Sequence, residues 1–232
     1  MKGRVATGSS QGRHFTQLDW ARRQFVQKLG LDPFPGTSKW IGAGGESLMN
    51  GAQSAARGNS PRDEVERVTL VDADDQTLGS CGKIEAHREG RLHRAFSILI
   101  TSPDGKLLLQ RRASGKYHFA NRWSNACCGH PRPGEITYDE ARRRLMEELG
   151  FTVPLIQVAE LSYRAEDAVS GLVEHEYLHV FHGTYSGDPE PDPDEVSAWQ
   201  WMRKERIRTI LASNPEQFTP WFAILVDGHV VD

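Results

Sequence analysis

Cysteines and long apolar runs are scarce in this chain of 232 residues, and each scarcity excludes a class of protein. Three cysteines (Cys81, Cys127 and Cys128) cannot form a disulfide framework, so we expect a reducing, cytoplasmic location. No apolar run approaches the roughly 18 residues that a membrane-spanning helix requires, so no membrane partner is expected. The first residues carry positive charge but no apolar stretch, which disfavours a secretory signal.

Net charge is also small, at −3, which argues against general binding to nucleic acid. Hydrophobic residues make up 38% of the chain, more than a disordered protein would contain. The length suits one sizeable domain with an appendage. The composition therefore predicts a soluble globular protein.

The first 60 residues differ in composition from the rest, with 8 Lys and Arg against 3 Asp and Glu, and 10 of the 22 glycines. Within residues 1–40, Leu18, Arg22, Phe25, Val26 and Leu29 recur at roughly helical spacing, which predicts an N-terminal extension with one helix. Residues 41–66 are mostly small and polar and cannot bury enough surface to offset the entropy of ordering. We predict that they form a flexible linker and that residues 67–232 form the main domain.

The main domain mixes strand and helix patterns. Strands are predicted over residues 68–72, 77–81, 94–101, 106–112, 123–128, 155–164, 172–181 and 196–202, and helices over residues 137–149, 204–212 and 220–226. The sequence Ser102-Pro103-Asp104-Gly105 predicts a tight turn between two of the strands, and the acidic, proline-rich residues 188–195 predict a loop. The order predicts an α+β fold, a mixed curved β-sheet with flanking helices in an α/β/α sandwich.

The helix at residues 137–149 has the clearest boundaries. Residues 137–140 (TYDE) predict a capping box, and Gly150 predicts the end of the helix. Ala141, Leu145 and Leu149 recur at every fourth position and predict one apolar stripe. Glu148 follows Arg144 by one turn, so a carboxylate and a guanidinium are expected on the same helix face.

The segment that contains this helix, residues 129–151 (GHPRPGEITYDEARRRLMEELGF), resembles the Nudix box. The resemblance rests on Gly129, Glu135, Arg143 and the run from Glu147 to Phe151. It implies a loop–helix–loop that holds a divalent cation on a diphosphate. The position after Arg143 is Arg144, whereas hydrolytic Nudix enzymes have a glutamate there, and this departure disfavours a hydrolase.

A narrower resemblance spans residues 68–221. The segments WSNACCGHPRPGE (123–135), LHRAF (92–96), YRA (163–165), VEHE (173–176) and FTPW (218–221) are similar, in the same order, to type I isopentenyl diphosphate isomerase of the Nudix superfamily. That family isomerises isopentenyl diphosphate to dimethylallyl diphosphate. The resemblance implies Mn²⁺ or Mg²⁺ bound by His87, His93, His130, Glu174 and Glu176, with Cys128 beside it, and a second Mg²⁺ on Glu148 that bridges the substrate diphosphate.

The residues themselves support a metal site. Glu174 and Glu176 alternate on a predicted strand, so both side chains face the same way and repel each other unless a cation or proton lies between them. Neutral histidine and carboxylate ligands suit Mn²⁺, Mg²⁺ or Zn²⁺, and two carboxylates favour the harder ions. The other histidines, at positions 14, 118, 175, 179, 182 and 229, are expected to be exposed or hydrogen-bonded rings without a role in the site.

The resemblance also implies residues that contact the substrate. Lys83, Arg112, Lys116 and Arg144 match positions that contact the diphosphate or its Mg²⁺, although ordinary surface charge is the alternative for each. Aromatic faces stabilise positive charge, so Phe96, Tyr163 and Trp221 are candidates to line a dry pocket around a carbocation; core packing explains Phe96 equally well.

The implied mechanism adds a proton to the double bond and removes another. Glu176 is the candidate acid toward C4, a tertiary cation follows, and Cys128 is the second acid–base group. Because Cys127 and Cys128 are adjacent in a predicted strand, we expect only Cys128 to face the metal, with a thiol activated by nearby cations, while Cys127 is a small buried residue.

Three alternatives remain open. The chain could be a Nudix-type diphosphate hydrolase, or a binding module for a metal or ligand without catalysis. Residues 12–37 vaguely resemble the beginning of an archaeal CTP-dependent riboflavin kinase, but the segment is too short for that domain and no activity is assigned to it. The expected partner is a small isoprenoid diphosphate, and the expected assembly is a monomer or weak dimer.

Overall fold

A computed structural model describes residues 65–228 and residue 230 of the chain. The predicted N-terminal helix, most of the predicted linker, His14 and His229 lie outside the described residues. Among the described residues, no helix is long and apolar enough to cross a membrane.

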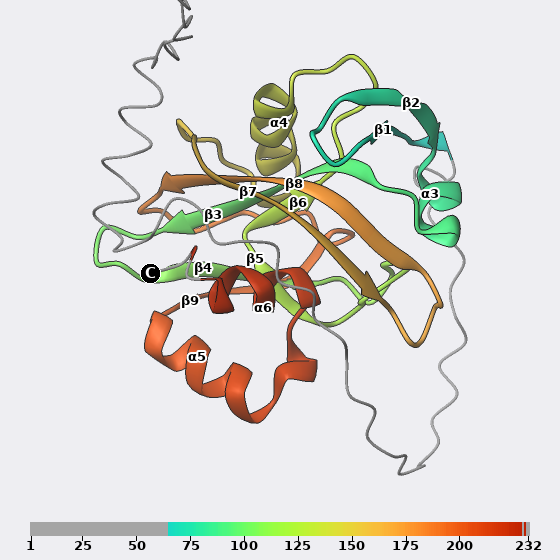
Figure 1. Cartoon of the computed structure of the whole chain (residues 1–232). Coiled ribbons are helices and arrows are strands. Elements are labelled where there is room, and N and C mark those ends of the chain that lie inside the picture. The colour runs from blue at the N-terminus through green and yellow to red at the C-terminus, as the bar shows by residue number, and fades with distance from the viewer. Residues whose placement is uncertain (1–64, 229, 231–232) are drawn as a thin grey trace, which may run out of the picture. The chain divides into compact units, whose positions relative to one another are not determined.

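Nine strands form one mixed sheet (Figure 1). They are β1 (Arg67–Val71), β2 (Thr77–Gly82), β3 (His93–Thr101), β4 (Leu107–Arg112), β5 (Trp123–Asn125), β6 (Cys127–Gly129), β7 (Ile156–Glu166), β8 (Val173–Thr184) and β9 (Val196–Met202). The hairpin of β1 and β2 and the turn between β3 and β4 are confirmed. Strand β9 has the predicted bounds, whereas β7 and β8 each extend two or three residues beyond the predicted end.

Strand β3 is central to the sheet. It pairs in parallel with β8 from His93 to Thr101, and β8 pairs in turn with β7 in antiparallel orientation. The hairpin partners β3 and β4 pair only at Thr101 and Leu107 and then diverge. Strand β6 pairs with β3, while β5 and β9 pair with β4. The sheet therefore opens between β3 and β4.

The prediction of one strand over residues 123–128 is wrong. Two short strands occupy the segment, with the buried Ala126 between them, because the chain crosses from β4 to β3 at this point. The side chain of Asn125 donates hydrogen bonds to the carbonyls of Ile98 and Cys127, each 3.0 Å long. These bonds satisfy backbone groups that the break in pairing would otherwise leave unpaired.

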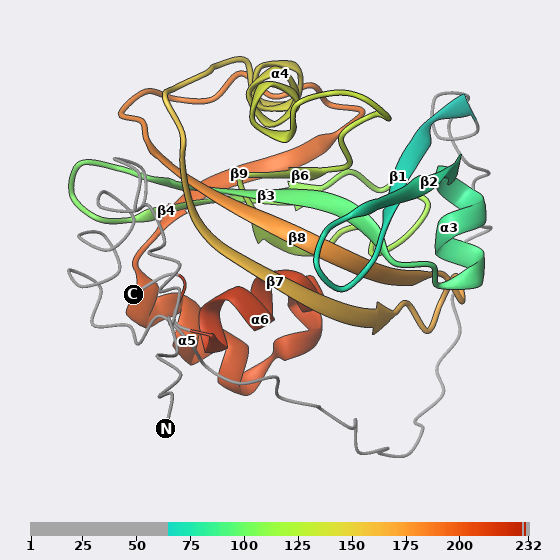
Figure 2. The same cartoon turned by 45° about the horizontal axis from the view of Figure 1, so that its top comes forward.

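Helices cover both faces of the sheet (Figures 1 and 2). Helix α4 (Thr137–Leu149) lies on one face, and α5 (Lys204–Ser213) and α6 (Pro220–Asp227) lie on the other; a short 3₁₀ turn (Pro215–Gln217) joins the last two. Helix α3 (Lys83–Glu89), which the sequence did not predict, lies beside β1 and β2 at one edge. The α+β sandwich is confirmed.

The apolar stripe of α4 packs into the main core. Ala141, Leu145 and Leu149 are fully buried against β3 residues such as Ile98 and Ile100. Full burial of a leucine side chain stabilises the fold by about 1.5–3 kcal/mol. Gly150 ends the helix at φ 74°, a left-handed conformation that favours glycine.

The predicted capping box is wrong. Helix α4 begins at Thr137 after Ile136, and no side chain bonds to its first N–H groups. Glu140 bonds instead to Arg143 one turn later, with a 2.8 Å contact to Nε. This ion pair places the glutamate on the side of the helix that faces the cleft described below.

Candidate functional site

The first histidine of the site comes from helix α3. His87 is fully buried, and its Nδ1 donates a 2.6 Å hydrogen bond to the Lys83 carbonyl. The bond fixes the ring so that Nε2 lies 3.0 Å from Oε2 of Glu174. Although burial opposes it, the Glu174 carboxylate raises the pKa of His87.

Two further histidines face the same point. His93, the first residue of β3, donates from Nδ1 to the Arg91 carbonyl at 2.8 Å. His130 follows β6, and its Nε2 lies 2.9 Å from Oε1 of Glu176. The His93 ring centroid is 4.9 Å from that of His87 and 4.8 Å from that of His130. Burial lowers the pKa of His93 to about 4, so its ring is neutral and has a lone pair to share.

Both glutamates of β8 face this cluster. Glu174 and Glu176 are 3% and 7% exposed, whereas the intervening His175 bonds to the Gly90 carbonyl on the other side. The parallel register with β3 sets Glu176 opposite His93. The predicted alternation along the strand is therefore confirmed.

The pKa values of the two carboxyl groups are shifted by their surroundings. Burial and the neighbouring Glu174 raise the pKa of Glu176 well above its usual value, and Tyr163 donates a 2.7 Å hydrogen bond to it. Burial also opposes ionisation of Glu174, but the imidazoles of His87 and His118 hold its pKa well below its usual value. The surroundings therefore shift the pKa values of the two carboxyl groups in opposite directions.

The donor atoms suit a divalent cation. One ligand atom from each of His87, His93, His130 and Glu174 lies within 4.8 Å of all the others. The Nε2 atom of His93 is buried without a hydrogen-bond partner among the described residues. A buried lone pair without a partner is costly, and a cation shared with the neighbouring donors removes that cost. These residues fit a metal ion.

Cys128 lies beside the metal cluster in the same cleft. Its thiol donates to Oδ1 of Asn125 at 3.3 Å and lies 3.2 Å from Oγ of Ser97. Cys127 is fully buried in the core beneath α4, so the predicted opposite orientation of the two cysteines is confirmed. Burial raises the pKa of the Cys128 thiol to about 12 in the metal-free protein, and its activation by a bound cation stays a prediction.

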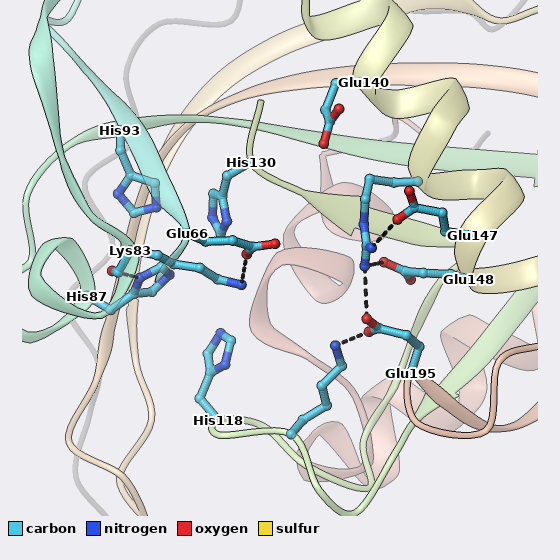
Figure 3. Close-up of polar contacts among 12 residues, drawn as sticks. Glu66, Lys83, His87, His93, His118, His130, Glu140, Glu147, Glu148 and Glu195 are labelled. Atoms are coloured by element: carbon cyan, nitrogen blue, oxygen red, sulfur yellow. Dashed lines mark hydrogen bonds and ion pairs between the residues drawn. The ribbon is translucent and has the colours of Figure 1, made fainter. Parts of the chain in front are cut away.

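The other side of the cleft carries acidic and basic side chains from α4 and two loops (Figure 3). Arg144 donates to Oε1 of Glu148 at 2.6 Å and to Oε1 of Glu195 at 3.1 Å. Lys116 also bonds to Glu195. Although burial opposes it, Lys116 and Arg144 lower the pKa of Glu195 to about 2. These groups form a cluster of alternating charge beside the histidines.

Three more predicted residues line the cleft. Trp221 donates from Nε1 to Oγ of Ser124 at 2.9 Å, and the guanidinium of Arg112 lies 5.4 Å from its ring centroid. Lys83 forms a 2.8 Å ion pair with Glu66. Phe96 does not line the cleft; it is fully buried in the core, where its ring lies 2.9 Å from the point where a Cβ on Gly129 would be.

All predicted metal, catalytic and diphosphate residues thus lie within one cleft or directly beside it. Its lining includes Lys83, Arg112, Lys116, Cys128, His130, Arg144, Glu148, Tyr163, Glu174, Glu176 and Trp221. His87 and His93 lie beneath it in the metal cluster. The lining also includes residues that the sequence did not single out, among them Gln110, Tyr117 and His118. The buried ring of His118 is hydrogen-bonded, as expected, but its partner is Glu174 of the site.

The other described histidines are hydrogen-bonded rings, as expected. His179 contacts Oδ2 of Asp75 at 3.0 Å, and His182 contacts Oγ1 of Thr101 at 2.9 Å. His175 bonds to the Gly90 carbonyl. None of the three belongs to the metal cluster found among the described residues.

Comparison with known proteins gives two family matches. A NUDIX domain matches residues 91–222. A Domain of unknown function, DUF120, whose model is named for a CTP-dependent riboflavin kinase, matches residues 5–39, which lie outside the described residues.

Relatives and a solved structure agree with the first match. An Isopentenyl-diphosphate Delta-isomerase of Halorhodospira halophila is 49% identical over 169 residues, which cover 72% of this chain and 97% of the relative. One of Serratia proteamaculans is 48% identical over 69% of this chain and 89% of the relative. The crystal structure of DR0079 from Deinococcus radiodurans, with 24% identity and a TM-score of 0.59, covers 70% of this chain and 98% of its own and shows the same fold. The chain belongs to the NUDIX family and, within it, to the family of isopentenyl-diphosphate Delta-isomerases.

Proposed function

We propose that the protein is an isopentenyl-diphosphate Delta-isomerase that converts isopentenyl diphosphate to dimethylallyl diphosphate. The observation that carries this proposal is the pairing of a buried carboxyl, Glu176, with a thiol, Cys128, in a cleft that also contains a cluster of metal ligands. The relatives at 48–49% identity support it.

The proposed site binds the two ends of the substrate separately. Lys83, Arg112, Lys116 and Arg144 offer cationic groups for the diphosphate, and Glu148 is the proposed ligand of a Mg²⁺ that bridges it. The histidine cluster with Glu174 and Glu176 is the proposed site of Mn²⁺ or Mg²⁺. When bound, these ions neutralise the diphosphate and the carboxylates.

The proposed reaction adds one proton to the substrate and removes another, so the substrate and the product have the same composition. The Glu176 carboxyl gives a proton to C4 of the double bond, and the positive charge appears at the tertiary C3. The Cys128 thiol first loses its proton to water, and the resulting thiolate takes a proton from C2, whose C–H electrons form the new double bond. The high pKa of Cys128 makes its thiolate a strong base once it forms. The Trp221 ring excludes water and presents an aromatic face to the cation.

Tyr163 has a supporting role in this proposal. Its hydroxyl donates to Oε2 of Glu176, and its side chain is 7% exposed. The hydrogen bond fixes the carboxyl relative to the substrate, so the group that transfers the proton is held in place.

Hydrolysis is the less favoured alternative. Arg144 occupies the position of a carboxylate that hydrolytic relatives use on their metal, and its guanidinium instead pairs with Glu147 and Glu148 on the same helix. The site therefore lacks one acidic ligand and gains a cation suited to a diphosphate that remains intact.

We further propose that residues 67–232 form the catalytic domain, with residues 1–40 as an extension and residues 41–66 as a linker. Three free thiols support function in a reducing compartment such as the cytoplasm. We propose that the protein acts as a monomer or weak dimer on this small substrate without nucleic acid or a membrane.

Incubation with isopentenyl diphosphate and Mg²⁺ in deuterated water tests the proposal. We expect dimethylallyl diphosphate that carries deuterium, because an exchangeable acid supplies the proton to C4. EDTA should abolish the reaction and Mg²⁺ or Mn²⁺ should restore it. Released phosphate without isomerisation would indicate a hydrolase, and full turnover in metal-free protein would refute the metal sites.

A further inference from the structure

A fourth histidine contacts the metal cluster from the loop between β4 and β5. The His118 side chain is 5% exposed, and its ring stacks on Tyr117 with the centroids 4.1 Å apart and the planes 23° from parallel. In Figure 3, His118 lies across from His87 and His130, and its ring points toward them. Its ring centroid lies 5.6 Å from that of His87.

The carboxylate of Glu174 lies between His118 and the other three rings. Its Oε2 atom is 3.0 Å from Nε2 of His87 and 4.0 Å from Nε2 of both His93 and His130. Its Oε1 atom forms a hydrogen bond with Nε2 of His118. One oxygen therefore faces the metal ligands, and the other faces away from them toward His118.

The hydrogen bond also fixes which nitrogen of His118 carries the proton. A carboxylate that binds a metal ion is deprotonated and only accepts hydrogen bonds, so Nε2–H of His118 is the donor. The Nδ1 atom is buried and has no hydrogen-bond partner among the described residues, which suits a neutral ring with its single proton on Nε2. His118 therefore meets Glu174 as a donor.

The loop around His118 is held from two sides. Arg112 donates a 3.1 Å hydrogen bond to the His118 carbonyl, and Asp167 accepts the backbone N–H of Phe119 at 3.3 Å. Phe119 has a φ of 47°, so this part of the loop follows a left-handed path that such contacts must stabilise. The donor is thus placed by tertiary contacts before any metal binds.

We propose that His118 is a positioning residue for the metal ligand Glu174. Its Nε2–H holds Oε1 so that Oε2 remains directed at His87, His93 and His130, and the carboxylate binds the ion through one oxygen. Residues that hydrogen-bond to a metal ligand orient it without binding the metal themselves, and their loss weakens metal affinity by about 10–100-fold. The inference rests on the proposed metal site and not on the reaction that the site catalyses.

The test is Mn²⁺ affinity, measured with the full chain by competition with a fluorescent chelator. His118→Phe keeps an aromatic ring against Tyr117 but removes the donor, and should weaken Mn²⁺ binding by about 10–100-fold. His118→Gln places an amide N–H near the position of Nε2 and should bind Mn²⁺ nearly as tightly as the original protein. His118→Asn is too short to reach Glu174 and should resemble His118→Phe, which keeps the test usable if the phenylalanine variant does not fold.

His182→Phe is the matched control, because His182 bonds to Thr101 and is not in the cluster. It should bind Mn²⁺ with unchanged affinity. Unchanged affinity in folded His118→Phe and His118→Asn would overturn the proposal, as would equal losses in the Gln and Phe variants. Failure of the original protein to bind Mn²⁺ would refute the metal site itself, whereas Mn²⁺ binding without isomerisation would refute only the proposed reaction.

Discussion

Cys127 and Cys128 offer a sharp test of the site, because two identical adjacent side chains have different surroundings. Cys127 is fully buried in the core under α4, whereas Cys128 lines the cleft. Replacement of either residue by alanine removes a single sulfur atom. The two variants therefore differ in the place of the change and not in its size.

The expected losses of stability are similar. Cys127→Ala leaves a small void in the core, which should cost about 1 kcal/mol and lower the melting temperature by about 2–4 °C. Cys128→Ala loses its hydrogen bonds to Asn125 and Ser97, and a hydrogen bond contributes about 1 kcal/mol. Both variants should fold.

The expected losses of activity are very different. If Cys128 exchanges the proton at C2, its removal should lower turnover by about 10²–10⁴-fold, whereas Cys127→Ala should turn over normally. Initial rates of isomerisation, together with thermal unfolding of both variants, measure the contrast. An inactive Cys127→Ala beside an active Cys128→Ala would show that the register of β6 is wrong.

Alkylation gives a second measurement on the same pair. Cys128 is the one partly exposed cysteine of the three, so it should be labelled first. With a pKa of about 12, its thiolate fraction rises about tenfold per pH unit near neutrality, and the labelling rate should rise with it. A rate that is independent of pH between 7 and 9 would contradict the raised pKa.

Three further predictions concern the diphosphate site, the domain boundary and the core. Glu148→Gln should raise KM for the substrate and weaken the Mg²⁺ dependence while the His/Glu site keeps its metal; loss of that metal, measured by elemental analysis, would show misassigned carboxylates. Deletion of residues 1–62 should leave a folded, active enzyme because their composition predicts few contacts with the domain, and an insoluble or inactive product would contradict this. Leu145→Ala should destabilise the fold by about 2–5 kcal/mol in denaturant titrations, since Leu145 is fully buried, and a loss below about 1 kcal/mol would contradict the packing of α4.

Elements with a regular apolar pattern were predictable from the sequence. The stripe of Ala141, Leu145 and Leu149 predicted both α4 and its buried face, because each turn of the helix repeats the same contact with β3. Alternation along β8 likewise predicted that Glu174 and Glu176 share a face. Such local patterns predict which side chains share a face even when the element that packs against them is not known.

Features that depend on contacts between distant segments were not predictable. Helix α3 has seven residues, too few for a helical period to be recognised, although it carries His87. His118 lies in a loop whose course depends on Arg112 and Asp167. The pKa of Cys128 depends on how deeply the folded chain buries it, and the sequence alone suggested the opposite direction.

The parallel pairing of β3 with β8 also bears on the order in which the chain folds. His93 lies opposite Glu176 only after the intervening β4, β5, β6, α4 and β7 segments have been enclosed in one long loop, whose closure opposes folding entropically. We therefore expect the metal ligands to converge late in folding, so that an ion that binds them stabilises the native state more than the transition state. Bound metal should slow unfolding while leaving the folding rate nearly unchanged. The site would then stabilise the completed sheet kinetically.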